Sequence, residues 1–279
     1  MGHQALLCAC RKQAEEQGCK SGAVTFSGHP DRLLRGAAPG LINTPQDRNK
    51  LLRQFDMETV LELPFDEAMM AMPWQEFCRM LICEHGASGF VCGSDFRFGK
   101  GGEGTAQTLA GFCEQEGLCC RVVPQQELYG VRISSTHIRA LLEQGKLQEA
   151  AGFLGHPHIL TGTVAAGKQL GRTIGIPTAN LSYPRELLML PHGVYACRVQ
   201  WDGACYNAMT NIGTRPTVSG TGVTVESHLL GFSGDLYGKT IQVSFYEYLR
   251  PEHKFPNLSC LEKQIEKDKF LVEKVMQNY

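Results

Sequence analysis

Three glycines followed by a hydroxyl and an amide make the segment 164–180 the part of this sequence best suited to chemistry. It reads V-A-A-G-K-Q-L-G-R-T-I-G-I-P-T-A-N, and its glycines permit tight turns in which backbone N–H groups can hold phosphate oxygens. Thr178 and Asn180 are two residues apart, so their side chains point the same way in an extended chain. Both offer oxygen atoms of the kind that Mg²⁺ accepts beside nucleotide phosphates. The glycines alone are typical of a hairpin, but with this pair they predict a nucleotide site.

Glu226 is an acidic residue within a predicted strand of otherwise apolar and β-branched residues. One interpretation is a surface glutamate on the outer face of that strand. The other is a general base aimed into the mouth of a barrel, where it would accept a proton from an attacking hydroxyl. Because side chains alternate between the two faces of a strand, the sequence leaves both interpretations open.

The first half of the chain holds two further candidate segments. Residues 93–104, G-S-D-F-R-F-G-K-G-G-E-G, form a glycine-rich loop after a predicted strand, a common place for ligands in α/β folds. Residues 133–139, I-S-S-T-H-I-R, open a predicted helix with hydroxyl side chains and place Arg139 one turn beyond Ser135. Unpaired N–H groups, hydroxyls and an arginine at a helix start favour an anion. Taken alone, the first segment would be a surface loop and the second a simple helix cap.

The composition of the 279-residue chain excludes several classes of partner. Lys+Arg 27 against Asp+Glu 28 leaves no basic surplus, which argues against nucleic acid. No apolar run approaches the roughly 20 residues of a membrane span. The 12 cysteines form no C-x-x-C pair, so we expect reduced thiols that serve as small core residues in a cytoplasmic protein, with no metal cluster and no disulfide.

Short apolar runs alternate with helical periodicity up to about residue 155. Strands are expected at Gly22–Phe26, Thr59–Leu63, Gly89–Cys92 and Cys119–Pro124. Helices are expected at Gln4–Gln17, Thr44–Phe55, Pro73–His85 and Gly104–Gln115, with two more at Ser134–Gln144 and Lys146–Leu154. Strands separated by helices predict βαβ units and a parallel sheet.

Beyond His156 short strands follow one another with glycine turns between them. They are expected at Ile159–Val164, Gly193–Trp201, Ala204–Asn211, Thr224–Leu230 and Thr240–Tyr248, a spacing that predicts a small antiparallel barrel. A last helix is indicated by a capping box of Ser259 and Glu262 and by apolar positions at Leu261, Ile265, Phe270 and Val272. We therefore predict two domains, 1–155 and 156–279.

From about Leu160 onward the sequence resembles bacterial riboflavin kinase modules. The motifs that carry the resemblance are G-R-x-x-G, P-T-A-N, G-V-Y-A at 193–196, N-I-G-T-R-P-T at 211–217 and V-E-S-H followed by L-Y-G-K. The resemblance implies a six-stranded β-barrel that phosphorylates the 5′-hydroxyl of riboflavin with ATP. One departure is Gly231, where the family commonly has Asp.

The same resemblance implies a set of site residues in the barrel. Thr178 and Asn180 would hold Mg²⁺ and the ATP phosphates, and Glu226 would be the catalytic base. The ATP would be covered by the segment that contains Gly167, Lys168, Gly171 and Arg172. The flavin would be bound near a mobile loop at 211–217, through Asn211, Arg215 and Thr217.

The first half resembles the FMN adenylyltransferase module of bacterial bifunctional FAD synthetases. T-F-S-G-H-P at 25–30, G-x-D-F-x-F-G and I-S-S-T-x-I-R occur in the family's order. The resemblance implies a Rossmann-like nucleotidylyltransferase fold that transfers AMP from ATP to FMN and releases pyrophosphate. It assigns to this site Asp95, Phe96 and Arg97 beside the substrates, Ser134, Ser135, Thr136 and Arg139 at the ATP phosphates, and also His3 and His29.

The family pattern also opens with a strand that runs into G-x-F-D-G-x-H-x-G-H, and of its two histidines only the second is matched here, by His3. We therefore expect an N-terminally truncated chain that makes FMN but little FAD. The main hypothesis is a bifunctional enzyme that acts on riboflavin, FMN and ATP. The alternatives are a riboflavin kinase with an inactive first domain, or a flavin- or nucleotide-binding regulatory protein without catalysis, against which the intact kinase motifs argue. The oligomeric state is left open, a homo-oligomer included.

Overall fold

The computed structural model describes residues 1–27, 39–165, 176–217 and 220–279, and of residues 215–217, 220 and 221 it describes the backbone alone. The chain divides into two compact units, one of residues 1–39 and 48–134 and the other of residues 40–47 and 135–279. The second unit therefore begins earlier than the domain boundary predicted at residue 156. That predicted boundary stays a prediction.

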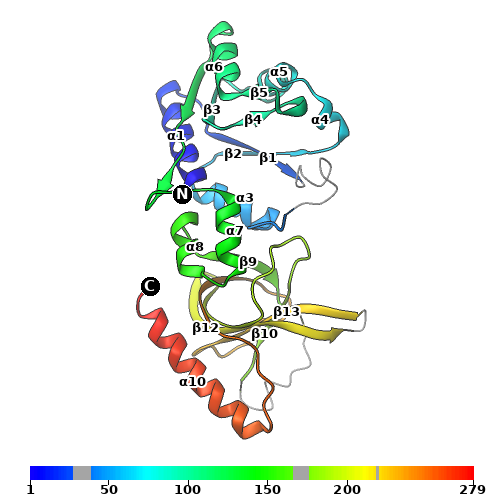
Figure 1. The fold of residues 1–279 in the computed structure, drawn as a ribbon, viewed down its shortest axis with the longest axis vertical. Coiled ribbons are helices and arrows are strands. Elements are labelled where there is room, and N and C mark those ends of the chain that lie inside the picture. Colours follow the sequence, from blue (N-terminus) through cyan, green and yellow to red (C-terminus); the bar gives the residue numbers. More distant parts are fainter. Residues whose placement is uncertain (28–38, 166–175, 218–219) are drawn as a thin grey trace. The chain divides into compact units, whose positions relative to one another are not determined.

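Two parallel pairs of strands, with helices between them, form the first unit (Figure 1). β1 (Gly22–Ser27) pairs with β2 (Thr59–Pro64), and β3 (Gly89–Gly93) pairs with β6 (Cys119–Val123). The helices are α1 (Gly2–Gln17), α3 (Pro45–Gln54), which crosses the division between the units, α4 (Glu67–Ala71), α5 (Trp74–His85) and α6 (Ala106–Gln115). The predicted parallel α/β architecture is confirmed, and in the described residues its strands form separate two-stranded sheets.

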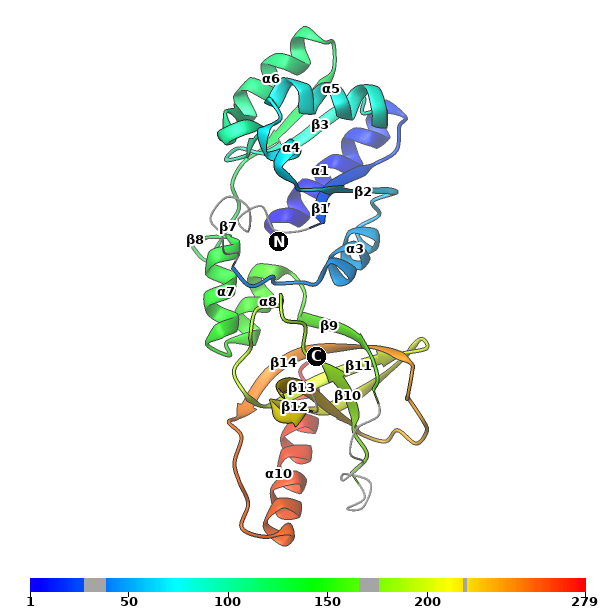
Figure 2. The same cartoon turned by 90° about the vertical axis from the view of Figure 1, so that its right-hand side faces the viewer.

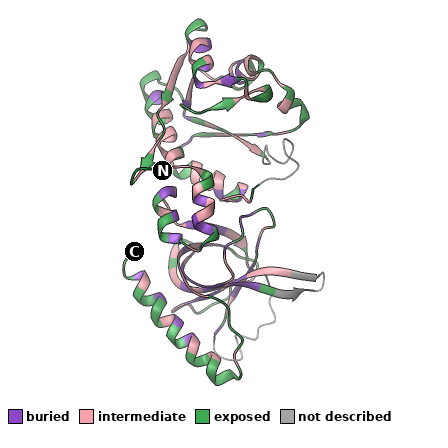
Figure 3. Ribbon diagram, in the orientation of Figure 1, coloured by how far each residue is buried: buried purple, intermediate pink, exposed green. Residues whose placement is uncertain are grey.

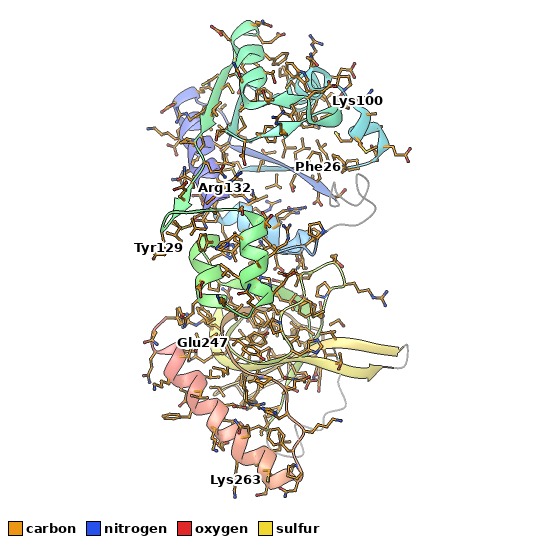
Figure 4. The ribbon with its side chains drawn as sticks, in the orientation of Figure 1. Phe26, Lys100, Tyr129, Arg132, Glu247 and Lys263 are labelled. Atoms are coloured by element: carbon orange, nitrogen blue, oxygen red, sulfur yellow. The ribbon has the colours of Figure 1, made fainter. Side chains whose placement is uncertain are left out.

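The first unit also contains short antiparallel hairpins. β4 (Arg97–Phe98) pairs with β5 (Gly104–Thr105) across the 3₁₀ turn η1 (Lys100–Gly102), inside the glycine-rich loop. β7 (Glu127–Leu128) pairs with β8 (Val131–Arg132), and Tyr129 at the tip of this hairpin is exposed (Figure 4). Both hairpins are too short for a hydrophobic pattern to reveal from the sequence.

The cysteines divide into buried and exposed groups. Cys78, Cys92 and Cys113 pack with Leu109 and Phe112 in the core of the first unit, and burial raises the pKa of the Cys78 thiol to about 11. They behave as the small core residues that the sequence predicted. That interpretation is wrong for five others, which are exposed: Cys8, Cys19, Cys83, Cys205 and Cys260. All twelve are free thiols.

The second unit is built on a six-stranded antiparallel sheet that curls into a nearly closed barrel, as predicted (Figure 2). Its strands, in their spatial order, are β10 (Ala179–Ser182), β13 (Gly220–Leu229), β12 (Ala204–Thr217), β11 (Gly193–Trp201), β14 (Thr240–Arg250) and β9 (His158–Thr163). The seam closes where the N–H of Ala165, just after β9, donates to the carbonyl of Asn180, 2.9 Å away. The sequence did not predict β10.

Buried residues recur along the strands of the barrel, as the colouring by burial shows (Figure 3), and at the start of β14 they alternate with less buried ones. The fully buried side chains include Leu181, Tyr195, Ile212, Val225 and Phe245. Burying five such side chains contributes on the order of 1.5–3 kcal/mol each. In β14 the period-2 pattern therefore corresponds to an inner and an outer face, whereas β11 is buried at most positions because the last helix also packs on it.

The segment 211–217, expected to be a mobile loop, instead continues strand β12. It pairs antiparallel with residues 220–226 of β13, from Asn211 opposite Glu226 to Thr217 opposite Gly220. Two adjacent strands extend together beyond the rest of the barrel, and their mutual hydrogen bonds replace the loop. The expectation of a loop is therefore wrong for the backbone of this segment.

Two helices and a short segment from earlier in the chain complete the base of the barrel unit. α7 (Ser135–Glu143) and α8 (Leu147–Leu154) pack together, and the Gln148 amide donates to Glu247 of β14 at 2.9 Å. The N–H of Leu41 donates to Glu186, and the N–H of Leu188 donates back to Leu41, each at 2.8 Å. Residues 40–47 are thus hydrogen-bonded into this unit.

The last helix, α10 (Leu258–Met276), lies against the outside of the barrel. Its N-cap is Asn257, whose side chain accepts from the Cys260 N–H at 2.9 Å, so the predicted capping box of Ser259 and Glu262 is wrong. Val272 and Met276 pack on β-strand residues, whereas Phe270, expected on the apolar face, is 66% exposed. Both Asn257 and Ser259 are residue types that can cap a helix, and the packing of α10 on the barrel selects the start after Asn257.

Candidate active site

Three of the residues predicted from motifs lie side by side on adjacent strands. Asn180 of β10 is directly opposite Glu226 of β13, and Glu226 is directly opposite Asn211 of β12. Side chains that face each other in antiparallel strands share one face of the sheet, with Cβ atoms about 4.5–5.5 Å apart. We call these three residues the polar row. Motifs that are separated along the chain are thus brought together by strand register.

The polar row lies on the outer face of the barrel. Val225 and Ser227, on either side of Glu226, are fully buried, so they point inward and Glu226 points the other way. Glu226 itself is half-buried, and its carboxylate accepts from the Thr224 hydroxyl at 3.3 Å. Of the two interpretations of this residue, the structure gives the outward orientation. Its role as a base stays a prediction.

Thr178 and Asn180 are connected to each other and to the barrel seam. The Asn180 side-chain NH₂ donates to the Thr178 carbonyl at 3.1 Å, which leaves the amide oxygen as the atom suited to accept or ligate. The backbone of the preceding Pro177 is held by His228, whose Nδ1 lies 2.9 Å from the Pro177 carbonyl. Burial lowers the pKa of His228, which favours the uncharged ring. Hydrogen bonds therefore hold the P-T-A-N segment at the end of the polar row.

A cavity of about 450 Å³ opens beside this segment. Thr178 and Asn180 line one side of it, and the loop 232–237 lines the other. Phe232 of that loop packs edge-on against Tyr206, with ring centroids 5.2 Å apart. A cavity with an apolar wall and a few convergent polar groups is typical of a small-molecule site.

The loop 232–237 was not predicted to belong to any site. Its local signals are the L-Y-G-K motif, which includes Leu236 and Tyr237, and the glycine at each end, Gly231 and Gly238, both with φ of 72°. Such left-handed positions favour glycine and delimit a tight loop. Nothing local in the sequence shows that this loop returns to the P-T-A-N segment.

Several predicted site residues lie outside the description. His29 and the nucleotide-covering residues Gly167, Lys168, Gly171 and Arg172 belong to segments that the structure does not describe. Arg215 and Thr217 are described only as backbone of β12. Their predicted contacts with ATP and flavin stay predictions.

In the first unit the predicted residues gather near the 93–104 loop. Asp95 pairs with Arg132 at 2.6 Å, a contact in which both side chains are more than half exposed. Phe96 stacks on Phe98 with ring centroids 5.0 Å apart, and Arg97 begins strand β4. Desolvation lowers the pKa of His3, and the charge of Asp95 opposes that shift, so these two groups interact.

The helix-start residues are divided between the units. Ser134 ends the first unit, while Ser135, Thr136 and Arg139 belong to α7 in the second. The Arg139 Nε donates to the carbonyl of Gly40 at 2.9 Å, so this guanidinium holds the segment 40–47 in the second unit. This structural contact was not predicted from the sequence.

Two family models match the chain, FAD synthetase over residues 1–137 and riboflavin kinase over residues 154–276. The bifunctional riboflavin kinase/FMN adenylyltransferase of Bacillus subtilis (strain 168) is 33% identical over 274 residues, which cover 96% of this chain and 86% of that protein. The protein of the same name from Escherichia coli (strain K12) is 35% identical over 270 residues, with the same coverage.

A solved structure is similar over almost the whole chain. The crystal structure of a macrolide-efflux protein from Streptococcus pneumoniae has a TM-score of 0.86 and 30% sequence identity, and the match covers 98% of this chain and 89% of that chain. Within the described part of the present chain, no helix combines the length and the apolar character that crossing a membrane requires.

Proposed function

The chain belongs to the family of bifunctional riboflavin kinases/FMN adenylyltransferases, and we propose that its kinase reaction takes place at the polar row of Asn180, Glu226 and Asn211. Riboflavin kinase and FAD synthetase regions are both present, so the chain is an enzyme with both activities. It phosphorylates riboflavin to FMN with ATP, and adenylylates FMN to FAD. The alternative of a kinase with an inactive first domain is not favoured, and neither is the expectation of little FAD, because the FAD synthetase match spans residues 1–137.

The observation that carries the proposed kinase site is the register of three strands. It sets Glu226 between two amides and next to the cavity that Thr178 and Asn180 line. In this arrangement Glu226 accepts the proton of the riboflavin 5′-hydroxyl as that oxygen attacks the γ-phosphate of ATP. The cavity receives the nucleotide, and Asn211 binds on the flavin side.

A magnesium ion fits the residues on the nucleotide side of this site. The Asn180 amide oxygen and the Thr178 hydroxyl are hard oxygen donors of the kind that Mg²⁺ prefers, and they would hold it with the ATP phosphates. When bound, the ion neutralises charge on the transferred phosphate. Thr178 and Asn180 contribute by keeping the triphosphate in line with Glu226.

For the adenylyl transfer we propose that Asp95, Phe96 and Arg97 contact the substrates, and that Ser134, Ser135, Thr136 and Arg139 contact the ATP phosphates. The stack of Phe96 on Phe98 supports a flat ring site beside Asp95. His3 joins this group through its interaction with Asp95. A cytoplasmic location and a homo-oligomer stay predictions.

A time course with riboflavin, ATP and Mg²⁺, in which FMN and FAD are separated by chromatography, tests the function. We expect FMN to appear first and FAD to follow. In the same assay Thr178→Ala should lower the rate of FMN formation by about 10²-fold and raise the Mg²⁺ concentration needed for half-maximal rate. An unchanged rate and Mg²⁺ dependence would remove Thr178 from the site, and failure of wild-type protein to form FMN would refute the function.

A further inference from the structure

A second carboxylate lies beside the polar row without a role in the proposed reaction. The Asn211 side-chain NH₂ donates to Glu252 Oε1 at 2.9 Å. Glu252 follows strand β14 and is exposed, whereas Asn211 faces Glu226 across the strands. The Asn211 amide is therefore placed between two carboxylates.

Gly213 makes room for this contact. A Cβ at position 213 would lie 2.7 Å from the Glu252 Cδ, closer than side-chain atoms approach one another. The backbone of Gly213 is not in the left-handed region, so its conformation does not require glycine. The requirement is for space: Glu252 lies across β12 at the one position where β12 has no side chain.

A buried ion pair fixes the segment that carries Glu252. Arg250 donates from Nε and Nη2 to the Asp268 carboxylate of α10 at 2.6–3.0 Å, and Asp268 is fully buried. Gln264 also donates to Asp268, at 2.9 Å. Bidentate, charge-assisted bonds to a buried carboxylate hold their partners in one geometry. Two residues beyond Arg250, the backbone of Glu252 is thus anchored to α10.

An asparagine amide has two N–H donors and one acceptor, and it can turn over to exchange them. Donation to Glu252 determines which way the Asn211 amide faces, because its oxygen would be repelled by that carboxylate. We propose that Glu252 is a positioning residue for riboflavin binding, which holds the Asn211 amide in the orientation that the flavin requires beside Glu226. This inference rests on the proposed kinase site.

The experiment measures the KM of riboflavin, the KM of ATP, kcat and the melting temperature in the full chain. Glu252→Ala should raise the KM of riboflavin about tenfold and leave the KM of ATP unchanged, since a bond to a charged group is lost on the flavin side only. Glu252→Gln, whose amide can either accept from or donate to Asn211 and so does not fix its orientation, should give a KM of riboflavin between those of wild type and Glu252→Ala. Gly213→Ala should resemble Glu252→Ala, because it displaces an intact glutamate.

A matched control is Glu262→Ala, which removes an exposed glutamate of α10 and should change none of these quantities. The double variant Asn211→Ala/Glu252→Ala should be no worse than Asn211→Ala alone, because both act through one amide. Additive losses, an unchanged KM of riboflavin in Glu252→Ala, or equal rises in both KM values with a lower melting temperature would overturn the inference. If wild-type protein forms no FMN, the proposed function itself fails.

Discussion

The two units place their candidate residues in different ways. In the barrel unit, backbone pairing aligns Asn180, Glu226 and Asn211. Glu226 and Asn211 have paired strands on both sides, and Asn180 on the end strand β10 has β13 on one side and the hydrogen bond from Ala165 on the other. In the first unit, Asp95 lies in a loop and pairs with Arg132 across the surface, while β4 is only two residues long. A site built on register is positioned by many hydrogen bonds, whereas a site built on loops depends on a few side-chain contacts. A change of one side chain should therefore alter the rate of the chemical step in the barrel unit, and the positions of the site residues in the first unit.

The largest effect is expected at the proposed base. Glu226→Gln keeps the shape and the bond from Thr224 but cannot take up a proton, so FMN formation should fall roughly 10²–10⁴-fold. FAD formation from added FMN should stay at the wild-type rate. Steady-state assays with riboflavin and with FMN measure the two reactions separately. Wild-type turnover of riboflavin would mean that Glu226 is a surface residue without a catalytic role.

The next largest effect is a pH dependence of the free energy of unfolding that we expect from the barrel unit. Burial lowers the pKa of His158 in the barrel to about 4, and neither ring nitrogen has a hydrogen-bond partner within the described structure. Above the unfolded pKa of about 6.5 the ring is neutral in both states, and the folded state keeps its full stability. As pH falls below that value, the unfolded chain takes up a proton that the folded protein does not, so the free energy of unfolding decreases. Unfolding free energy should drop by about 2 kcal/mol from pH 7 to pH 5.

Denaturant titrations at pH 7 and pH 5, with the unfolding of the barrel unit as the measured signal, test this expectation. His158→Leu should remove most of the pH dependence, because no ionisable group replaces the imidazole. His85, which is exposed in the first unit, is the matched control, and His85→Gln should leave the dependence in place. An equal pH dependence in His158→Leu and wild type would show that other groups are responsible.

A smaller effect is expected from the loop site. Asp95→Asn should lower the rate of FAD formation from FMN about tenfold, through weaker positioning by Arg132, and leave riboflavin phosphorylation unchanged. Since the ion pair is more than half exposed, its loss should change the unfolding free energy by less than about 1 kcal/mol. Loss of FMN formation in this variant would contradict the separation of the two sites.

The smallest effect distinguishes two caps for α10. Asn257→Ala should cost about 1 kcal/mol of unfolding free energy, since its side chain accepts from the Cys260 N–H. Ser259→Ala should be close to neutral, because Ser259 lies inside the helix. Thermal unfolding of both variants gives the comparison. The reverse order would restore the capping box that the sequence predicted.

The sequence by itself determined the order and type of most elements. Short apolar runs separated by turn glycines predicted β11 and β14, because these signals are local and lie within a few residues of one another. The P-T-A-N motif and Glu226 were also identified from residue types alone. The four-residue strand β10 was not predicted, because so short a run has too few alternations of apolar and polar residues to be distinguished from a loop.

Tertiary structure decided which face Glu226 occupies and which residues stand beside it. Alternation along β13 is compatible with either face, and only the burial of Val225 and Ser227 inside the barrel excludes one. The position of Asn211 opposite Glu226, its hydrogen bond to Glu252, and the return of loop 232–237 to Thr178 join residues far apart in the chain. Strand register and helix packing set these neighbours, and both depend on the whole buried core rather than on any local stretch of sequence.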